Sequence, residues 1–126
     1  MPDVNSDCLV IVLNQGGIEH GTWVARELRQ TGYPVRELTG AVEPDDVFQA
    51  ASGHSSRVLL PVSIVDHLWC ANNRTGLQAA GIGFVVDEAE RIATFANKVS
   101  CYRTIEASGL LDPGNYPAFR LISGVE

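Results

Sequence analysis

The sequence contains no long apolar run. The longest, Cys8–Leu13, is far shorter than the roughly 20 residues that a transmembrane helix needs. No positively charged segment of the kind that opens a signal peptide precedes this run. We therefore expect no membrane segment and a cytoplasmic location.

Lysine is almost absent. The chain has one Lys and eight Arg against 15 acidic residues, which gives a formal net charge of −6. Proteins bind nucleic acids largely by neutralising phosphates with Lys and Arg side chains. Because the basic residues here form no cluster, we expect no extended nucleic-acid binding. This argument does not exclude a small local patch of basic residues.

Cysteine and histidine are too few and too scattered to form a metal centre or a disulfide framework. The three cysteines (Cys8, Cys70 and Cys101) are widely spaced, and the three histidines never form an H-x-x-x-H pattern. We expect no metal site and no cofactor. Cys70 precedes Arg74 by about one helical turn, so a reactive thiol is one interpretation and a buried thiol is the other.

Several catalytic and nucleotide-binding motifs are also missing. The glycines after the first apolar run do not fit G-x-G-x-x-G, no G-K-[ST] follows them, and no G-x-S-x-G is present. These absences argue against a dinucleotide fingerprint, a Walker loop and a nucleophile elbow.

The most informative segment that is present runs from Cys8 to Arg29. It reads as a buried strand (CLVIVLN), a glycine-containing turn (QGGIEHG) and a helix. We predict the helix over Thr22–Thr31, with Gly32 ending it. Its apolar positions Trp23, Val24, Ala25 and Leu28 lie at helical spacing.

The rest of the chain alternates strands and helices, which predicts a mainly parallel sheet. Hydrophobic residues at 45% and a length of 126 residues fit one α/β domain over residues 1–126. The predicted elements are an extended piece at Pro34–Thr39, a helix at Pro44–Ala51, a strand at Arg57–Val65 interrupted near Pro61, a helix at Leu68–Ala80 capped by Asp66, a strand at Gly83–Val86, helices at Glu88–Asn97 and Val99–Ala107, and a last strand at Ala118–Ser123.

The turn Asn14–Gly21 is the first candidate site, because open α/β sheets place ligands outside the carboxyl ends of their strands. Its amide groups and the following helix N-terminus suit an anion or a developing negative charge. His20 is a candidate catalytic acid or base, since histidine side chains titrate near neutral pH. The residues of this turn that we predict to bind substrate are Asn14, Gly16, Gly17, Glu19 and Gly21. A glycine-rich turn with an exposed histidine is the plainer interpretation.

Asp87 is the second candidate catalytic residue, because it follows the predicted strand Gly83–Val86 directly. A carboxylate at that position would share the crevice with the first turn. Glu90, three residues on, is a further candidate for substrate binding. The competing interpretation is that Asp87 is the N-cap of the next helix and that Glu90 completes an approximate capping box.

The pattern of the chain resembles the type 2 peptidyl-tRNA hydrolase superfamily, in particular its small bacterial relatives. The matching features are VIVLN ending in Asn14, the glycine turn into an alanine-containing helix, LPVSIV, VVDEA and the closing AFRLIS. The resemblance implies a three-layer α/β/α fold around a four-stranded mixed sheet whose last strand is antiparallel. Asp87 matches the family's aspartate in placement, but the first turn lacks the family's lysine and the helix lacks its A-A-Q pattern. We therefore expect a shared fold without peptidyl-tRNA hydrolysis.

A second resemblance is to cobalamin-binding and flavodoxin-like modules. GIEHGTWVARELRQTGYPV and EPDDVFQAA are similar to their first helix and the start of their second. The D-x-H-x-x-G pattern that supplies the axial histidine of cobalamin is missing. A cofactor-binding remnant is thus one alternative function.

The leading expectation is a small enzyme that carries out acid–base chemistry at a carbonyl, by hydrolysis or cyclisation of an amide or ester in a small molecule. His20 or Asp87 would move the proton, and the turn amides would stabilise negative charge. The alternative is a non-catalytic module that binds a ligand or a protein. Small domains of this size commonly form homodimers, but no residue pattern here locates an interface.

Overall fold

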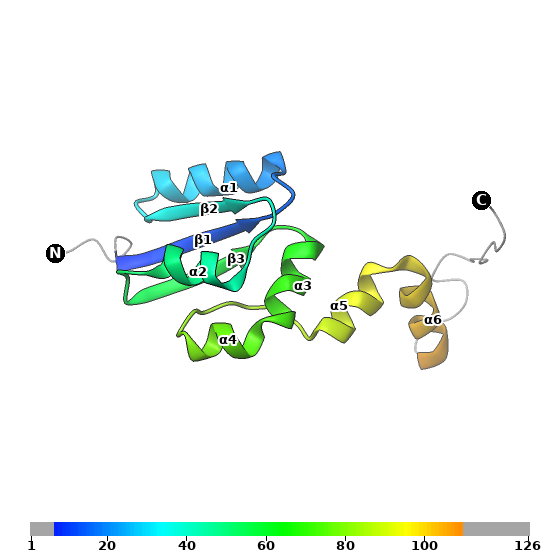
Figure 1. Ribbon diagram of the computed structural model, residues 1–126. Coiled ribbons are helices and arrows are strands. Elements are labelled where there is room, and N and C mark those ends of the chain that lie inside the picture. The colour runs from blue at the N-terminus through cyan, green and yellow to red at the C-terminus, as the bar shows by residue number, and fades with distance from the viewer. Residues whose placement is uncertain (1–6, 110–126) are drawn as a thin grey trace. The chain divides into compact units, whose positions relative to one another are not determined.

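A three-stranded parallel sheet of order β2-β1-β3 organises the first part of the chain (Figure 1). The computed structural model describes residues 7–109, and the chain divides into two compact units, Met1–Asp87 and Glu88–Glu126. Each unit is described by itself. The elements of the first unit are β1 (Cys8–Asn14), α1 (Glu19–Gln30), β2 (Val35–Thr39), α2 (Pro44–Ala51), β3 (Ser56–Pro61), α3 (Ile64–Asn72) and α4 (Arg74–Ala79).

β1 is the central strand, and both of its faces are buried. It pairs in parallel with β2, with Val10 opposite Val35, and with β3, with Val10 opposite Val58. Every residue from Leu9 to Asn14 is buried. This confirms the buried strand expected from its continuous apolar sequence, because a strand covered on both faces shows no polar alternation.

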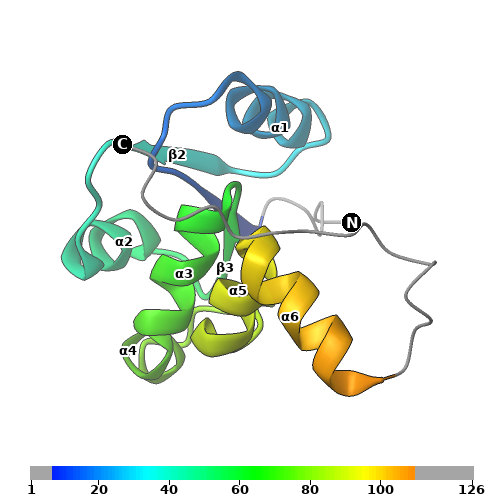
Figure 2. The ribbon, with the colours of Figure 1, turned by 90° about the vertical axis from the view of Figure 1, so that its right-hand side faces the viewer.

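Helices cover the two faces of β1 through alternating side chains. Val10 and Val12 pack with Ala25 of α1 in one cluster, whereas Leu9, Ile11 and Leu13 belong to a second, larger cluster. The second cluster also contains residues of the other three helices and nearby segments: Val42, Val47, Ala50, Ala51, Leu59, Cys70, Leu77 and Ile82. Figure 2 shows the same division, with α1 on one side of the sheet and α2, α3 and α4 on the other. Each fully buried Leu, Ile or Val side chain contributes roughly 1.5–3 kcal/mol to folding.

α1 begins at Glu19, three residues earlier than the sequence predicted. The structure confirms its end: Gly32 has φ +97°, its N–H donates to Arg29, and the N–H of Tyr33 donates to Leu28. This is the double hydrogen bond of a Schellman cap. Of the apolar positions at helical spacing, Ala25 is fully buried, whereas Trp23 is 46% exposed.

β3 ends at Pro61, and the strand predicted over Gly83–Val86 is reduced to one bridge between Val58 and Gly83. Leu59 N–H donates to Gly83 O at 2.8 Å, and Gly83 N–H donates to Arg57 O at 3.0 Å. The next rung of a parallel ladder would need an N–H on Pro61, which proline lacks. The interruption expected at Pro61 is therefore confirmed, but the segment Val62–Val65 is not strand.

The helix predicted over Leu68–Ala80 is two helices, α3 and α4, which meet at Asn73. α3 begins at Ile64, and its N-cap is Ser63, not Asp66 as predicted. Asp66 is the third helical residue and completes a capping box with Ser63. The S-x-x-D spacing of that motif is visible in the sequence.

The second unit contains α5 (Ala89–Ala96) and α6 (Lys98–Ser108), close to the two helices predicted there. The strand predicted at Ala118–Ser123 lies outside the described residues. The parallel α/β architecture is thus confirmed over residues 7–109, whereas the fourth strand, the three-layer arrangement and the single domain stay predictions.

Candidate functional site at the carboxyl edge of the sheet

The three parallel strands end at the same edge of the sheet, and the turns that follow them carry most of the candidate residues. β1 ends at Asn14, β2 at Thr39 and β3 at Pro61. Ligands of open α/β sheets bind outside this edge. The contacts within the turns decide which side chains are available to a ligand.

Asn14 is completely buried, and both polar atoms of its side chain form hydrogen bonds, with Ile18 of its own turn and with Glu37 of β2. Its Oδ1 accepts from the N–H of Ile18 at 3.0 Å, and its Nδ2 donates to the carbonyl of Ile18 at 2.9 Å. Nδ2 also donates to Glu37 Oε2 at 2.9 Å. Asn14 therefore closes the turn into α1, so its side chain is committed within the structure rather than to a ligand.

Gly21 is a glycine because Asn14 lies against it. A Cβ built on Gly21 would lie 2.5 Å from Asn14 Nδ2 and 2.6 Å from Asn14 Cγ, closer than real contacts allow. Gly16 and Gly17 differ, since both are exposed and a Cβ on either would meet no atom closer than 3.5 Å. Gly17 has φ +60°, which favours glycine for conformational reasons.

Asp66 ties the turn after β3 to the turn after β1. Its Oδ1 accepts from the backbone N–H of Gln15 at 3.1 Å and from Gln15 Nε2 at 3.0 Å. Its Oδ2 accepts from the N–H of Ser63 at 2.9 Å and from Ser63 Oγ at 3.0 Å. Burial alone would raise the pKa of Asp66, but these hydrogen bonds from Ser63 and Gln15 together hold the pKa below its ordinary value. Asp66 is thus an ionised, fully buried clamp.

His67, one residue after Asp66, is a candidate that the sequence analysis did not single out. Its Nδ1 lies 2.7 Å from the carbonyl oxygen of Ser63, and its side chain is partly exposed. The signal available in the sequence was the position of a histidine four residues after a Ser N-cap, directly past a strand end.

His20 lies in the first turn of α1 and is exposed. Its ring stacks against Trp23, with ring centroids 6.0 Å apart and an interplanar angle of 19°. Glu19, also exposed, precedes it in the same turn. The structure therefore leaves both predicted side chains accessible at the start of α1.

Glu37 is a second residue that the sequence analysis missed. It lies near the end of β2, where its Oε2 accepts from Asn14 Nδ2 and from Thr22 Oγ1, each at 2.9 Å. The carboxylate links β2 to the first turn and to α1. The sequence offered the signal of an acidic residue inside a short strand, which is uncommon away from a functional or structural contact.

Asp87 is exposed at the end of the first unit, and Arg74 binds the backbone beside it. Arg74 Nη2 donates to the carbonyl of Val86 at 2.7 Å and to that of Asp87 at 3.0 Å. The Arg74 guanidinium also lies 5.4 Å from the centroid of the Phe84 ring. The competing interpretation of Asp87 as an N-cap was wrong, because Glu88 is the N-cap of α5.

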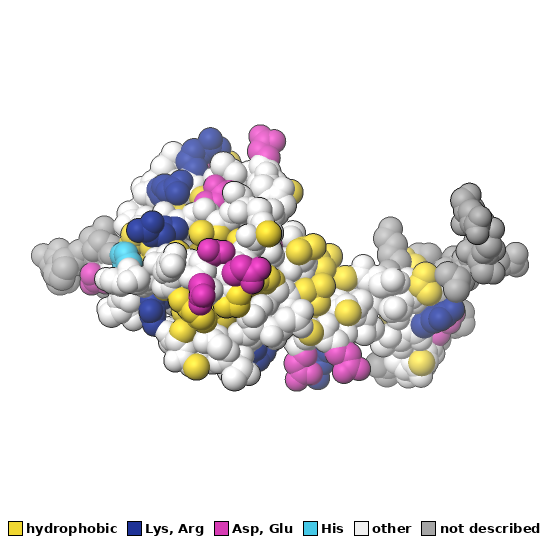
Figure 3. All heavy atoms as spheres, in the orientation of Figure 1, with side chains coloured by type: hydrophobic (Ala, Val, Ile, Leu, Met, Phe, Trp, Pro, Cys, Tyr) yellow, Lys and Arg dark blue, Asp and Glu magenta, His cyan; other side chains and the backbone are white. Residues whose placement is uncertain are grey.

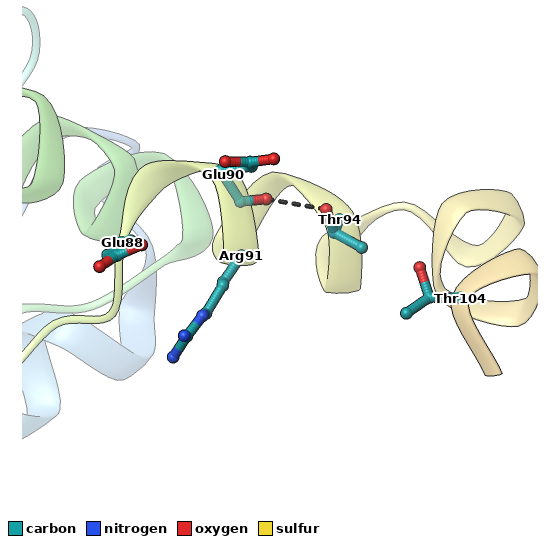
Figure 4. A pocket seen from close by; sticks show the side chains of 5 residues that line it. All are labelled: Glu88, Glu90, Arg91, Thr94 and Thr104. Atoms are coloured by element: carbon teal, nitrogen blue, oxygen red, sulfur yellow. Dashed lines mark hydrogen bonds between the residues drawn. The ribbon is translucent and has the colours of Figure 1, made fainter. Parts of the chain in front are cut away.

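Glu90 belongs to the second unit, where it lines a hollow of about 410 Å³ with Glu88, Arg91, Thr94 and Thr104. Figure 4 shows that the side chains of Glu90 and Arg91 point away from each other. Thr94 Oγ1 donates to the backbone carbonyl of Glu90 at 2.8 Å. Glu90 is therefore placed in an open acidic hollow of its own unit.

The Cys70 thiol is unsuited to nucleophilic chemistry. It is fully buried, and burial together with the charge of Asp66 raises its pKa to about 12, against the opposite effect of Arg74. The thiolate is the reactive form of cysteine. The interpretation of Cys70 as a buried thiol is thus favoured over that of a reactive one.

Charge is distributed unevenly over the first unit. Figure 3 shows basic side chains over α1 and acidic ones over α2. The acidic residues include Glu43 and Asp46, which form the capping box of α2.

Within residues 7–109 no group of His, Cys, Asp and Glu side chains could hold a metal ion, and no helix there is long and apolar enough to cross a membrane.

No family model matches the chain, and no curated protein or solved structure is significantly similar to it. Any function assigned to the carboxyl edge therefore rests on the chemistry of its own residues.

Proposed function

We propose that the protein is a small-molecule enzyme whose site lies at the carboxyl edge of the sheet in the first unit. The reaction class is acid–base chemistry at a carbonyl, by hydrolysis or cyclisation of an amide or ester. The observation that carries the proposal is the clamp between Gln15 and Asp66, which fixes the turns after β1 and β3 against each other. A rigid pair of turns is what positions catalytic groups within the small tolerances that they need.

The first turn supplies groups suited to an oxyanion. The amides of Gly16, Glu19 and His20 donate no hydrogen bond within the described part of the chain, while that of Ile18 is taken by Asn14. Amides at a helix N-terminus lack intrahelical partners and favour negative charge. They would stabilise the oxygen that becomes negative when a nucleophile adds to a carbonyl.

His20 and Asp87 remain the proposed proton-transfer groups, and both are exposed. Asn14 and Gly21, which we expected to bind substrate, have structural roles that account for them: one closes the turn and the other makes room for it. We also propose that the chain shares the four-stranded, three-layer fold of the type 2 peptidyl-tRNA hydrolases.

The alternative is a non-catalytic binding module. The observation that favours it is that Asn14 and Asp66, which are the fully buried polar side chains among residues 7–109, have their hydrogen-bonding atoms bound within the protein. Such a network is equally suited to a rigid binding surface without chemistry. Tight ligand binding without turnover would distinguish this function from the enzyme.

A thermal-shift panel tests the proposal on the full chain. It contains nucleotides, flavin, cobalamin, acylated amino acids and an N-acylated aminoacyl-tRNA, since a ligand that binds the native state raises the melting temperature by mass action. We expect one class to shift the wild type and to shift Asp87→Asn and His20→Gln less. Asp45→Asn, an exposed aspartate in the first turn of α2, is the control. Equal shifts in all four proteins would contradict the assignment of Asp87 and His20.

A further inference from the structure

The geometry of His67 fixes which of its ring nitrogens carries the proton. Nδ1 lies 2.7 Å from the backbone carbonyl of Ser63, and a carbonyl oxygen can only accept a hydrogen bond. In the neutral ring Nδ1 is therefore protonated, and Nε2 keeps its lone pair. We propose that His67 is a general base of the carboxyl-edge site and acts through Nε2. This inference rests on the function proposed above.

Nε2 of His67 is not fully buried. Between residues 7 and 109, Arg57 Nε is the buried side-chain nitrogen or oxygen that has no hydrogen-bond partner. Nε2 makes no hydrogen bond with the described residues, so it would stand beside Arg57 Nε if it were buried. A lone pair that is both unoccupied and accessible is what a general base requires.

A chain of hydrogen bonds connects the His67 ring to the turn after β1. Ser63 O accepts both the Nδ1 proton and the His67 backbone N–H, the latter at 2.9 Å. The amide and hydroxyl of Ser63 are bound to Asp66, and Asp66 is bound to Gln15. The imidazole is thus oriented relative to the β1–α1 turn, whose free amides were assigned to the oxyanion.

His67 differs from the other two histidines in this respect. His20 stacks on Trp23, and no ring nitrogen of His20 or His54 makes a hydrogen bond within the described chain. Neither ring has its tautomer fixed by a partner. A histidine with a fixed tautomer loses no free energy in selecting the reactive form.

The step that His67 would perform is the activation of water. Nε2 takes a proton from a water molecule as its oxygen bonds to the substrate carbonyl carbon, and the carbonyl π electrons move to the carbonyl oxygen. When the tetrahedral intermediate collapses, the bond to the leaving group breaks. The imidazolium returns its proton to the leaving group, so the histidine ends as it began.

The first test is the tautomer. Long-range proton–nitrogen NMR on uniformly labelled protein, with His67 assigned by comparison with His67→Gln, reports which nitrogen is protonated. We expect the Nδ1–H form, whereas exposed histidines in water favour Nε2–H. An Nε2–H tautomer at His67 overturns the proposal whatever the thermal-shift panel finds, because this measurement needs no ligand.

The second test separates chemistry from structure with two variants. In His67→Asn the side-chain amide can still donate to Ser63 O but offers no base, whereas His67→Gln places its amide near the Nε2 position. With p-nitrophenyl acetate as probe, we expect both variants to lose about tenfold or more of the hydrolysis rate, at the low end of general acid–base effects. His54→Gln is the matched control and retains the rate.

A wild-type rate no higher than that of His67→Asn overturns the proposal, as does a loss confined to His20→Gln. Circular dichroism of each variant verifies that it is folded. If the thermal-shift panel is silent while His67 shows the expected tautomer and rate loss, the reactive base stands and the ligand classes of the panel are the part that fails.

Discussion

The turns that follow β1 and β3 are closed in the same way but by side chains of different charge. Each joins a strand to a helix, and each is closed by one fully buried polar side chain, Asn14 in the first turn and Asp66 in the second. Asn14 is a neutral amide that both donates and accepts, while Asp66 is an ionised acceptor of four hydrogen bonds.

The difference follows from the neighbours. Asn14 faces Glu37, so a donor is required there, and Asp66 faces only donors from Gln15 and Ser63. Two side chains of nearly equal shape are therefore not interchangeable once their surroundings require a donor at one position and only acceptors at the other. Substituting each side chain by the other, one position at a time, tests this difference directly.

Asn14→Asp should have the largest effect. It places a second carboxylate at a fully buried position, where Asn14 Nδ2 now lies 2.9 Å from Glu37 Oε2. We expect a loss of about 3–5 kcal/mol at pH 7, the usual cost of an uncompensated buried charge. The loss should shrink as the pH falls, because protonating one carboxyl restores a donor. Urea denaturation at pH 7 and pH 5 measures both effects, and a loss independent of pH would contradict this account.

Asp66→Asn should cost somewhat less, about 3 kcal/mol, since the amide oxygen can keep the donors of one side but not those of both. The matched control is Asp46→Asn in α2, which stands at the same position of a capping box but is exposed. We expect the control to cost about 1 kcal/mol or less. Equal losses in the two variants would show that burial of Asp66 contributes nothing.

Asp66 should also make the stability of the wild type depend on acid. Its pKa is lowered in the folded protein, so its contribution is present above the ordinary aspartate value near about 4 and is lost as the pH falls through the lower folded value. Subtracting the unfolding free energies of Asp66→Asn from those of the wild type, from pH 7 down to pH 3, isolates this contribution. A difference that grows on acidification would have the wrong sign.

Gly21→Ala should have a smaller effect, a loss of roughly 1–3 kcal/mol from crowding Asn14. The sign is informative, because Gly21 is the third residue of α1 and alanine ordinarily stabilises a helix relative to glycine. Gly16→Ala is the control, since its Cβ would make an ordinary contact at 3.5 Å with Ile18. Thermal denaturation compares the two, and a stabilised Gly21→Ala would show that Asn14 can move aside.

Much of the fold could be predicted from the residues because its signals are local. The continuous apolar run of β1, the glycine after α1 and the proline that begins α2 each act on their own neighbours. The absence of a strand at Gly83–Val86 was harder to predict, since it depends on which residues of β3 lie opposite this segment. Pro61 was identified as an interruption, but only the register shows which rung it removes.

The candidate site was less accessible to prediction for the same reason. Asn14 and Gly21 were identified by their place in the turn, yet their mutual contact depends on how α1 leaves the strand. Both hydrogen-bond donors to Asp66 Oδ1 belong to Gln15, 51 residues away, and no spacing rule connects the two residues. Glu37 and His67 gained their importance only from neighbours that the folded chain supplied.

Pro61 also determines how wide this sheet can become. A growing sheet recruits its next strand through amide protons presented along its edge, and proline withholds one at the rung where Val85 would dock. The edge is thereby protected from recruiting foreign strands as much as from extending its own ladder. The missing backbone N–H of one proline thus limits the width of the sheet at this edge. Replacing Pro61 by a residue that has a backbone N–H is the first change to make in a design that adds a strand here.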